Sequence, residues 1–411
     1  MPLSAALEVR AGSDGDLIDG VRPRLVAAPE TTEALAETLA GASGEELGVV
    51  VTGGGTKLAW GAPPGTIDLQ LSTARLGAVL EHRHGDLTAT IQAGTTLASA
   101  NMELAGHGQR LPWDPPWPDG ATIGGIVATN DSGPRRHGYG SPRDAIIGVS
   151  LARVDGQVAK AGGIVVKNVA GYDLSRLLTG SFGCLGVILT ATFKLAPIPA
   201  ASRTVEVTAG TLEAAAKAAV ALTGSRLTPT AIELTGAPPR LLVRFESVEA
   251  SVAQQADEAV GIASAEGAAA SVLDGAAEDA VWQRHAAHWD GDGTLVKLST
   301  VPAELFPTLV QLRDRAAEAG VGLVASGRAG LGVVDLRLDG PAEAEAQLIR
   351  ELRDRLPVGR GSAVIRRGSA ELRSQIDPWG PIGDALPLMR AVKRQFDPDG
   401  RLNSGRGPGG C

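Results

Sequence analysis

The residues in this sequence that are best suited to chemistry are glycines that follow an expected strand. The apolar run 47–52 leads directly into residues 53–57, Gly-Gly-Gly-Thr-Lys. Because glycine lacks a Cβ atom, successive glycines let backbone N–H groups converge on one anion. The spacing matches neither G-x-x-x-x-G-K-[ST] nor G-x-G-x-x-G, which excludes the P-loop and Rossmann fingerprints. Taken alone, the segment is either a phosphate cradle or a plain glycine turn between strands.

Two further glycine-dense segments favour the phosphate cradle over the plain glycine turn. One spans residues 119–140 and the other spans residues 162–188. Three such segments at this separation could surround one extended ligand with a pyrophosphate at its centre. The alternative is three unrelated loops, which the shared composition makes the weaker reading.

The elements expected around these segments are mixed α/β. The patterns predict helices at 30–42 and 97–106 and strands at 47–52, 67–71, 86–93, 146–155 and 185–195. Residues 111–144 show no regular period and are rich in glycine and tryptophan, so we expect a functional loop there rather than a linker.

Beyond residue 199 the chain becomes alanine-rich, and a β-α-β-β-α-β order occurs twice, over 204–273 and again over 294–365. This order predicts a doubled ferredoxin-like unit. We therefore expect three parts: a first domain over residues 1–199, a second over 200–370, and a helix with a tail over 371–411 that returns to the first domain.

Composition excludes several functional classes. With 38 Lys and Arg against 46 Asp and Glu, the net charge is −8, which gives no electrostatic reason to bind nucleic acid or an anionic membrane. Two cysteines are too few for a disulfide framework or a cysteine-ligated iron–sulfur cluster. We see neither a secretory signal nor a membrane span, so we expect a cytoplasmic protein, or one that associates with a membrane through partners.

The glycine segments, together with residues 396–405, resemble the vanillyl-alcohol-oxidase flavoproteins that have a PCMH-type FAD-binding domain. Residues 163–176 and the Ser132-Gly-Pro-Arg-Arg136 stretch make the chain most similar to the FAD-binding E subunits of bacterial glycolate oxidases. The resemblance is strong over residues 48–199. It implies an α+β fold with a two-subdomain FAD-binding domain, and a substrate cap in which the doubled unit forms an antiparallel sheet.

The resemblance also implies roles for individual residues. The residues that would bind the FAD pyrophosphate through backbone amides are Thr52, Gly53, Gly54, Gly55, Thr56, Lys57 and Leu58. Those that would line the flavin are Thr122, Gly124, Gly125, Ala128 and Gly133. Those that would hold the adenosine end are Gly183, Gly186 and Ile188, and Asn403 would return toward the isoalloxazine ring.

Covalent attachment of the flavin in these relatives uses a His in the pyrophosphate loop or a Cys in the second segment. Residues 52–58 contain no His, and Cys184 at the adenosine end is the one upstream cysteine. The sequence therefore predicts non-covalent FAD. His137, in the flavin-side loop, is a rival attachment residue.

Oxidation of a 2-hydroxy acid needs a cation for the carboxylate, a base for the hydroxyl proton and a hydride acceptor. Catalytic relatives carry a histidine-rich, metal-binding segment in the cap, and here Arg328 and Asp335 stand where its two histidines would be. We expect no metal site in the cap. The candidate catalytic residues are Lys167, Tyr172 and Arg328.

Two other groups of cap residues have competing interpretations. Arg284, like Arg328, could clamp a carboxylate or form a surface salt bridge. His285 and His288 lie three residues apart on an expected helix at 279–289. A third metal ligand is lacking there, so packing or a solvated helix face is favoured over a metal site.

The resemblance implies an FAD-dependent oxidoreductase that takes part in the oxidation of glycolate to glyoxylate. It implies a complex in which electrons pass through FAD, with a catalytic flavoprotein subunit and an iron–sulfur subunit as partners. The alternative is a self-sufficient FAD-dependent dehydrogenase of glycolate or D-lactate. A relic that no longer binds FAD is the third reading, and the intact glycine segments argue against it.

Overall fold

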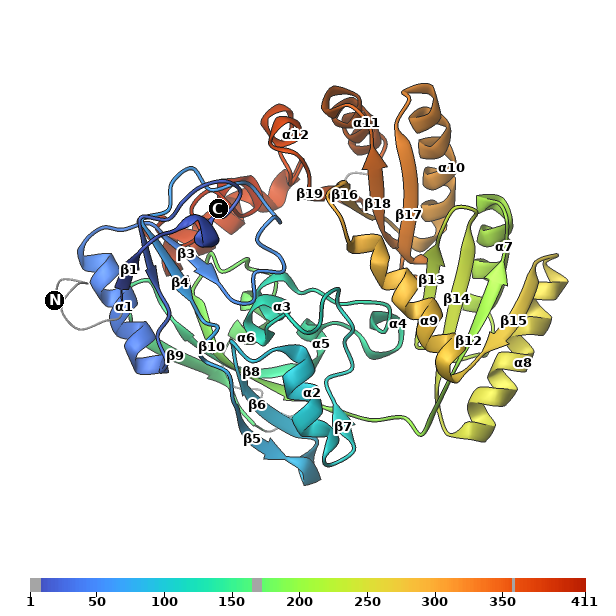
Figure 1. Ribbon diagram of the computed structural model, residues 1–411, viewed down its shortest axis with the longest axis horizontal. Helices are drawn as coiled ribbons and strands as arrows, with labels where there is room; N and C mark the ends of the chain where they lie inside the picture. The colour runs from blue at the N-terminus through green and yellow to red at the C-terminus, as the bar shows by residue number, and fades with distance from the viewer. Residues whose placement is uncertain (1–8, 165–171, 357–358) are drawn as a thin grey trace. The chain divides into compact units, whose positions relative to one another are not determined.

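The computed structural model describes residues 9–164, 172–356 and 359–411. The chain divides into two compact units, each with its own apolar core (Figure 1). Unit 1 contains residues 1–133, 140–198 and 384–411, and unit 2 contains residues 134–139 and 199–383. Within the described residues, none of the helices combines the length and the apolar character that a membrane span requires.

The first sheet of unit 1 has four strands in the order β1-β2-β4-β3. Strands β2, β4 and β3 run parallel to one another, and β1 pairs antiparallel with β2. The strands are β1 (Val9–Ala11), β2 (Leu25–Ala27), β3 (Val49–Thr52) and β4 (Leu69–Ser72), and a 3₁₀ turn, η1 (Asp14–Asp16), follows β1.

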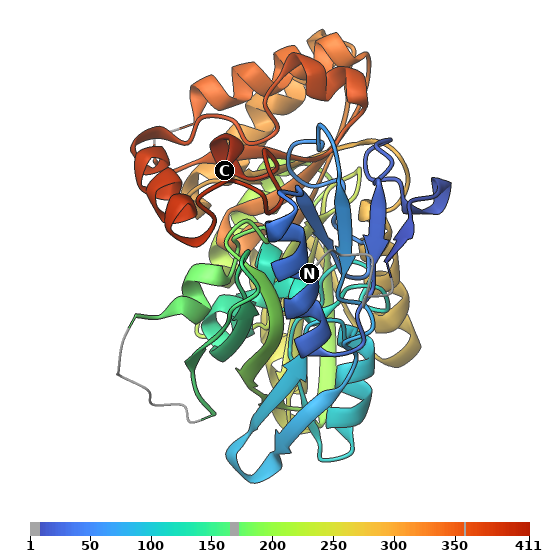
Figure 2. The ribbon, with the colours of Figure 1, turned by 90° about the vertical axis from the view of Figure 1, so that its left-hand side faces the viewer.

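Helix α1 (Thr32–Gly44) packs beside this sheet. It begins where Thr31 caps it, with the Thr31 hydroxyl accepting from the Ala34 N–H at 3.1 Å. Its buried Leu35 and Leu39 share one apolar cluster with residues of both sheets of unit 1. Helix α1 therefore lies alongside both sheets (Figure 2).

The second sheet of unit 1 has five antiparallel strands in the order β5-β6-β10-β8-β9. They are β5 (Val79–Arg83), β6 (Thr88–Gln92), β8 (Ile146–Ala152), β9 (Val158–Gly162) and β10 (Val187–Lys194). The helices that pack on it are α2 (Leu97–Ala105), α3 (Ile123–Thr129) and α6 (Leu174–Leu178). A short pair, β7 (Gln109–Arg110) with β11 (Ala196–Pro197), lies beside α2, and the 3₁₀ turn η2 (His84–Asp86) joins β5 to β6.

The strands expected from the sequence near 47–52, 67–71, 86–93, 146–155 and 185–195 are confirmed as β3, β4, β6, β8 and β10. The expectation of no regular structure over 111–144 is wrong in part, because α3, α4 (Arg136–Tyr139) and α5 (Pro142–Ala145) lie there. Glycine at two of the first three positions of α3 masks its helical pattern, since glycine disfavours helix. The buried side chains of Ile123, Ile126 and Val127 nevertheless hold it against the sheet.

Unit 2 confirms the doubled β-α-β-β-α-β order. The first copy consists of β12 (Ala201–Thr208), α7 (Leu212–Thr223), β13 (Ala231–Thr235), β14 (Arg240–Ser247), α8 (Glu249–Ala265) and β15 (Ala269–Leu273). The second consists of β16 (Thr294–Ser299), α10 (Pro302–Glu318), β17 (Gly322–Arg328), β18 (Val333–Asp339), α11 (Ala342–Arg355) and β19 (Ser362–Arg367). Pairing of β13 with β17 joins the copies into one eight-stranded antiparallel sheet.

The two faces of this sheet differ. Helices α7, α8, α10 and α11 cover one face with an aliphatic core that includes Val205, Leu298 and Leu336. The other face carries α9 (Gly275–Ala286) and the 3₁₀ turn η3 (Ala287–Trp289), which bond to polar side chains of the strands. Alternation along each strand sends apolar residues to the first face and polar residues to the second.

The remaining elements are short, and they divide between the units. Unit 2 also contains the 3₁₀ turn η4 (Ala329–Leu331) and α12 (Ala370–Gln375). The chain then passes through η5 (Gly383–Ala385) to α13 (Leu386–Phe396) and the final turn η6 (Pro408–Gly410) of unit 1. A β-bridge between Val49 and Leu402 fixes this last segment beside β3.

Candidate functional site

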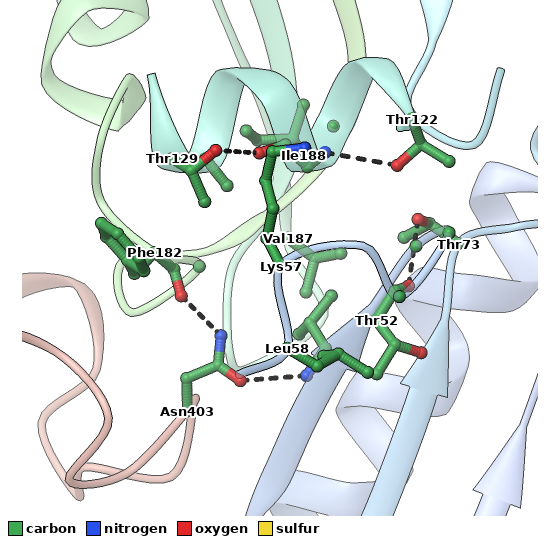
Figure 3. A pocket seen from close by; sticks show the side chains of 18 of the residues that line it. Thr52, Lys57, Leu58, Thr73, Thr122, Thr129, Phe182, Val187, Ile188 and Asn403 are labelled. Carbon is green, nitrogen blue, oxygen red and sulfur yellow. Dashed lines mark hydrogen bonds between the residues drawn. The ribbon is translucent and has the colours of Figure 1, made fainter. Parts of the chain in front are cut away.

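A cleft of about 820 Å³ lies within unit 1, where the glycine segments meet the C-terminal segment (Figure 3). Its walls come from the loop after β3, from α3, from the turn before β10 and from the segment after α13. Four stretches that are distant in sequence therefore build one site.

The first wall is the loop that follows β3. The carbonyl of Thr52 accepts from the Thr73 N–H at 2.8 Å, which fixes the point where the loop leaves the sheet. A Cβ atom at Gly54 would lie 1.7 Å from the Gly120 carbonyl oxygen, and one at Gly53 would lie 2.3 Å from the Thr122 hydroxyl. Both positions thus require glycine for close packing against the second segment.

The backbone of this loop offers hydrogen-bond donors to the cleft. Over the described ranges, the N–H groups of Gly53, Gly54, Gly55 and Thr56 donate to no protein acceptor, and all four residues line the cleft. Consecutive backbone N–H groups in a turn form an anion-binding concavity. The loop therefore fits the diphosphate of a dinucleotide cofactor.

The second wall is α3, which presents little side-chain volume. The Thr122 hydroxyl caps the helix by accepting from the Gly125 N–H at 3.4 Å, and the Thr129 hydroxyl donates to the Gly125 carbonyl at 2.7 Å (Figure 3). Gly124 packs against Ala93, where a Cβ atom would lie only 2.8 Å away. A helix face made of glycine, alanine and threonine leaves room for a flat ring to approach the backbone.

Asn403 ties the remaining walls together. Its side-chain oxygen accepts from the Val51 N–H at 3.0 Å, and its side-chain nitrogen donates to the Phe182 carbonyl at 2.7 Å (Figure 3). Its own backbone N–H donates to the Val49 carbonyl at 2.8 Å. One buried amide therefore holds the C-terminal segment, β3 and the turn before β10 in place.

Two cations lie along the cleft. The ammonium of Lys57 is 3.4 Å from the Asp131 carboxylate, and both side chains are buried. The guanidinium of Arg406 donates to the carbonyls of Leu58 and Trp60. Positive charge beside a row of N–H donors favours a phosphate-bearing ligand.

The structure brings together nearly all the residues predicted for the cofactor. The predicted residues that line the cleft are Thr52, Gly53, Gly54, Gly55, Thr56, Lys57, Leu58, Thr122, Gly124, Gly125, Ala128, Gly183, Gly186, Ile188 and Asn403. Gly133 does not line it: a Cβ atom there would lie 1.8 Å from the Asp114 carbonyl oxygen, which explains the glycine by packing. Lining residues that the sequence analysis missed are Val51, Trp60, Thr73, Thr129, Phe182, Val187 and Arg406. Arg406 could have been predicted to line the cleft, because it lies only three residues after Asn403 in the sequence.

The predicted catalytic residues are not gathered at this cleft. Lys167 lies outside the described residues. The side chain of Tyr172 is 94% exposed and does not line the cleft. Arg328 belongs to unit 2, where its buried guanidinium lies 3.3 Å from the Asp335 carboxylate. The roles of all three stay predictions.

His137, the rival attachment residue, lies on α4 in unit 2 and is not among the residues that line the cleft. Its ring packs against Gly330, where a Cβ atom would lie 2.6 Å from Cε1 of the ring. Burial lowers the pKa of this imidazole below its usual value.

Around Arg328, the polar face of the unit 2 sheet concentrates positive charge. The Asp335 carboxylate also lies 3.0 Å from Arg366, and it accepts from the Trp289 indole at 3.2 Å. Lys297 pairs in register with Asp335 across β16 and β18. The pKa of Lys297 is lowered to about 7, first by burial and then by the neighbouring cations Arg366 and Arg328.

This cluster therefore places Lys297, Arg328 and Arg366 around a single carboxylate, and the nearby Arg136 of unit 2 also acts on Lys297. Several cations around one anion produce a positive potential that suits a further anion. Guanidinium groups bind carboxylates particularly well, because their planar N–H donors match the two oxygens. The face can serve as a receptor for a carboxylate.

His285 and His288 are confirmed as packed residues. The His285 ring lies 5.5 Å from that of Trp282 and 5.3 Å from that of Trp289, and its Nε2 atom is 3.0 Å from Glu233. Nε2 of His288 lies 3.0 Å from the Asp335 carbonyl, and burial lowers the pKa of His288 to about 4. The alternative of a solvated helix face is wrong for His285, which is buried.

Comparison with known families and proteins gives consistent results. Residues 23–162 match the FAD binding domain family, and residues 382–406 match the C-terminal domain of FAD linked oxidases. The chain is 27% identical to glycolate oxidase subunit GlcD of Bacillus subtilis, over 93% of this chain and 88% of that protein. It is 28% identical to a D-lactate dehydrogenase of Archaeoglobus fulgidus, over 98% of both.

A third relative matches a shorter part of the chain at higher sequence identity. The chain is 38% identical to glycolate oxidase subunit GlcE of Escherichia coli, over 42% of this chain and 49% of that protein. Among solved structures, p-cresol methylhydroxylase superposes with a TM-score of 0.74 at 14% identity, over 94% of this chain and 89% of that one. At this identity the structural match shows the fold alone, and it confirms the predicted α+β class with its antiparallel cap sheet.

Proposed function

We propose that the chain is an FAD-linked oxidoreductase with a PCMH-type FAD-binding domain, and that it is the FAD-binding subunit of a glycolate oxidase assembly and takes part in the oxidation of glycolate to glyoxylate. The observation that carries the proposal is the cluster of Lys297, Arg328 and Arg366 around Asp335 on unit 2, which we propose as a receptor for the substrate carboxylate. The other unit of the chain holds the glycine-lined cleft that we propose for FAD.

FAD supplies a ring system that accepts a hydride from the substrate carbon. In this proposal the N–H groups of the loop after β3 bind its diphosphate, and Gly125 and Ala128 of α3 face its ring. Lys57 and Arg406 balance the phosphate charge. On unit 2, Arg328 and Lys297 are the residues that would bind a substrate carboxylate.

We propose that the FAD is held without a covalent bond. Residues 52–58 offer no histidine. Cys184 is a poor nucleophile, because burial raises the pKa of its thiol to about 11. Its Sγ atom lies 3.3 Å from the carbonyl oxygen of Cys411, and Cys184 is not among the residues that line the cleft.

The proposed partners are a catalytic flavoprotein subunit and an iron–sulfur subunit. Two relatives are named as separate subunits of glycolate oxidase, which supports an assembly. With two cysteines, this chain lacks the four thiolates that a cluster usually requires, so one-electron transfer would leave through a partner. We propose a cytoplasmic location, with any membrane attachment made through the partners.

The second candidate function is a self-sufficient dehydrogenase of glycolate or D-lactate. Its support is the match to a D-lactate dehydrogenase over nearly the full length of both chains. In that case the receptor on unit 2 would serve catalysis within this chain alone.

Anaerobic reduction of bound FAD separates these functions. The FAD-loaded chain is mixed with glycolate or D-lactate, with and without the partner subunits, and the flavin absorbance is followed. Bleaching that requires the catalytic flavoprotein partner supports the assembly, and bleaching of the isolated chain supports the self-sufficient enzyme. Lack of bleaching by either acid, even with both partners present, contradicts both.

A further inference from the structure

The eight-stranded sheet of unit 2 ends in β15 on one side and in β19 on the other, which are equivalent strands of the two repeats (Figure 1). The outer edge of β19 is covered: the Ile365 N–H donates to the Pro378 carbonyl at 2.8 Å, and the Arg353 guanidinium donates to the Ala363 carbonyl at 2.9 Å. Within the described residues, the backbone of 269–273 forms no hydrogen bond to any segment other than β12. The outer edge of β15 therefore presents N–H and C=O groups that can pair with a further strand.

The other open sheet edges of the described chain are protected, and β15 is not. Proteins usually guard an edge strand with charged side chains or with a covering segment. The edge strands β1, β5 and β9 carry charged residues, at Arg10, Glu81 and Lys160. The edge strand β3 is covered by the C-terminal segment through its bridge to that segment. Residues 267–273, Gly-Ala-Ala-Ala-Ser-Val-Leu, have neither protection.

The sequence of β15 is complementary to itself. When two copies pair antiparallel about a twofold axis through Ser271, Ser271 lies opposite its own copy. Ala270 then lies opposite Val272, and Ala269 lies opposite Leu273. Each larger side chain meets an alanine, so neither face of the joint sheet is overcrowded, and the two serine hydroxyls at the axis can hydrogen-bond.

The charge of the protein favours a second copy at this edge over a charged partner. The net charge is −8, so two copies repel each other wherever their acidic surfaces meet. Residues 267–273 bring no charge to the contact, and a basic or acidic partner would find no counter-charge on this strand. The side chain of Val272 is 41% exposed, so pairing also removes apolar surface from water.

We propose that β15 is the contact through which two copies of this chain form a twofold-symmetric dimer, so that their unit 2 sheets join into one continuous antiparallel sheet. A contact centred on one short strand is small, and small interfaces give weak, reversible association. None of residues 269–273 lines the cleft of unit 1, so the proposal stands independently of the proposed function.

Sedimentation velocity of the FAD-loaded chain, over about 1–200 μM, tests the dimer. We expect a reversible dimer with a Kd of about 1–50 μM. Ser271→Lys places two ammonium groups opposite each other at the axis and should weaken the dimer at least about 10-fold. Ser374→Lys is the matched control, because it makes the same change at another exposed serine of unit 2, on α12, and should leave the dimer unchanged. Circular dichroism checks that both variants are folded.

Disulfide trapping with a mild oxidant tests the register, in a Cys411→Ser background that leaves only the buried Cys184. Directly opposite Cβ atoms lie about 4.5–5.5 Å apart, so Ser271→Cys should link two copies. Ala269→Cys should not, because the two copies of residue 269 lie about 14 Å apart along the strands.

A chain that stays monomeric at about 200 μM, or a dimer that Ser271→Lys leaves intact, overturns the proposal. Failure of Ser271→Cys to link the copies, or equal linking by Ala269→Cys, overturns the twofold pairing of β15.

Discussion

Substitution of Asn403 offers a quantitative test of how the cleft is assembled. Asn403→Ala removes two hydrogen bonds, one from the Val51 N–H and one to the Phe182 carbonyl, and it leaves the Val51 N–H without its acceptor. Each unpaired buried group costs about 1–3 kcal/mol. Asn403 also has a φ of +47°, a left-handed conformation that costs alanine about another 1 kcal/mol. With about 1–3 kcal/mol for the Val51 N–H, about 0.5–1.5 for the lost bond to Phe182 and about 1 for the conformation, we expect the free energy of unfolding to fall by about 2.5–5.5 kcal/mol in total.

Asn403→Gly separates the two contributions. Glycine adopts the left-handed conformation freely, so this variant should lose the hydrogen bonds alone and be about 1 kcal/mol more stable than the alanine variant. FAD affinity should fall at least about 10-fold in both, since Val51 and Phe182 line the cleft and lose a common anchor.

The assay is urea unfolding of the FAD-free chain, followed by circular dichroism, with FAD affinity measured by fluorescence. Ser404→Ala is the control, because Ser404 is the exposed neighbour of Asn403 and should change stability by less than about 0.5 kcal/mol. A loss below about 1 kcal/mol in Asn403→Ala would refute the reasoning. Equal stability of the glycine and alanine variants would refute the conformational part.

Substitutions at two other lysines and one labelling experiment probe charge and burial. Lys57→Met removes the ammonium that pairs with the buried Asp131 carboxylate, and should lower the free energy of unfolding in urea by about 3 kcal/mol. The double variant Lys57→Met with Asp131→Leu should recover most of that stability but not the affinity for FAD. The pKa of Lys297 is lowered in the folded chain, so between about pH 7 and 10 the unfolded chain keeps a proton on Lys297 that the folded chain has lost. The free energy of unfolding should therefore rise with pH over this range, by at most about 1.4 kcal/mol per pH unit. Lys297→Met should remove that rise. Mass spectrometry after treatment with iodoacetamide at pH 8 should show one alkylated cysteine, Cys411, because burial raises the pKa of the Cys184 thiol to about 11. Rapid labelling of Cys184 would contradict its burial.

The features that could be predicted from the sequence are those encoded locally. The doubled unit 2 pattern is readable because each strand and helix has its own period, and Thr31 marks the start of α1. The cleft could be predicted from its glycines, because close backbone packing leaves no room for a side chain at Gly53 or Gly54 and therefore leaves a visible glycine pattern in the sequence.

The features that could not be predicted depend on strand pairing. Lys297, Arg328 and Arg366 lie on three strands, and only the order β17-β18-β16-β19 places them around Asp335. The short helix α3 could not be predicted either, because its glycines disfavour a helix locally and the burial of its apolar side chains is what stabilises it.

FAD titration of the FAD-free chain tests the central claim most directly, namely that the glycine loop after β3 cradles the cofactor. Wild type should bind one FAD per chain, and acid precipitation should release all of it. Gly54→Val should weaken binding at least about 100-fold while the fold persists by circular dichroism, because its Cβ would lie 1.7 Å from the Gly120 carbonyl oxygen and force the loop away. Unchanged affinity in Gly54→Val, or flavin that stays with the precipitate, would contradict the account.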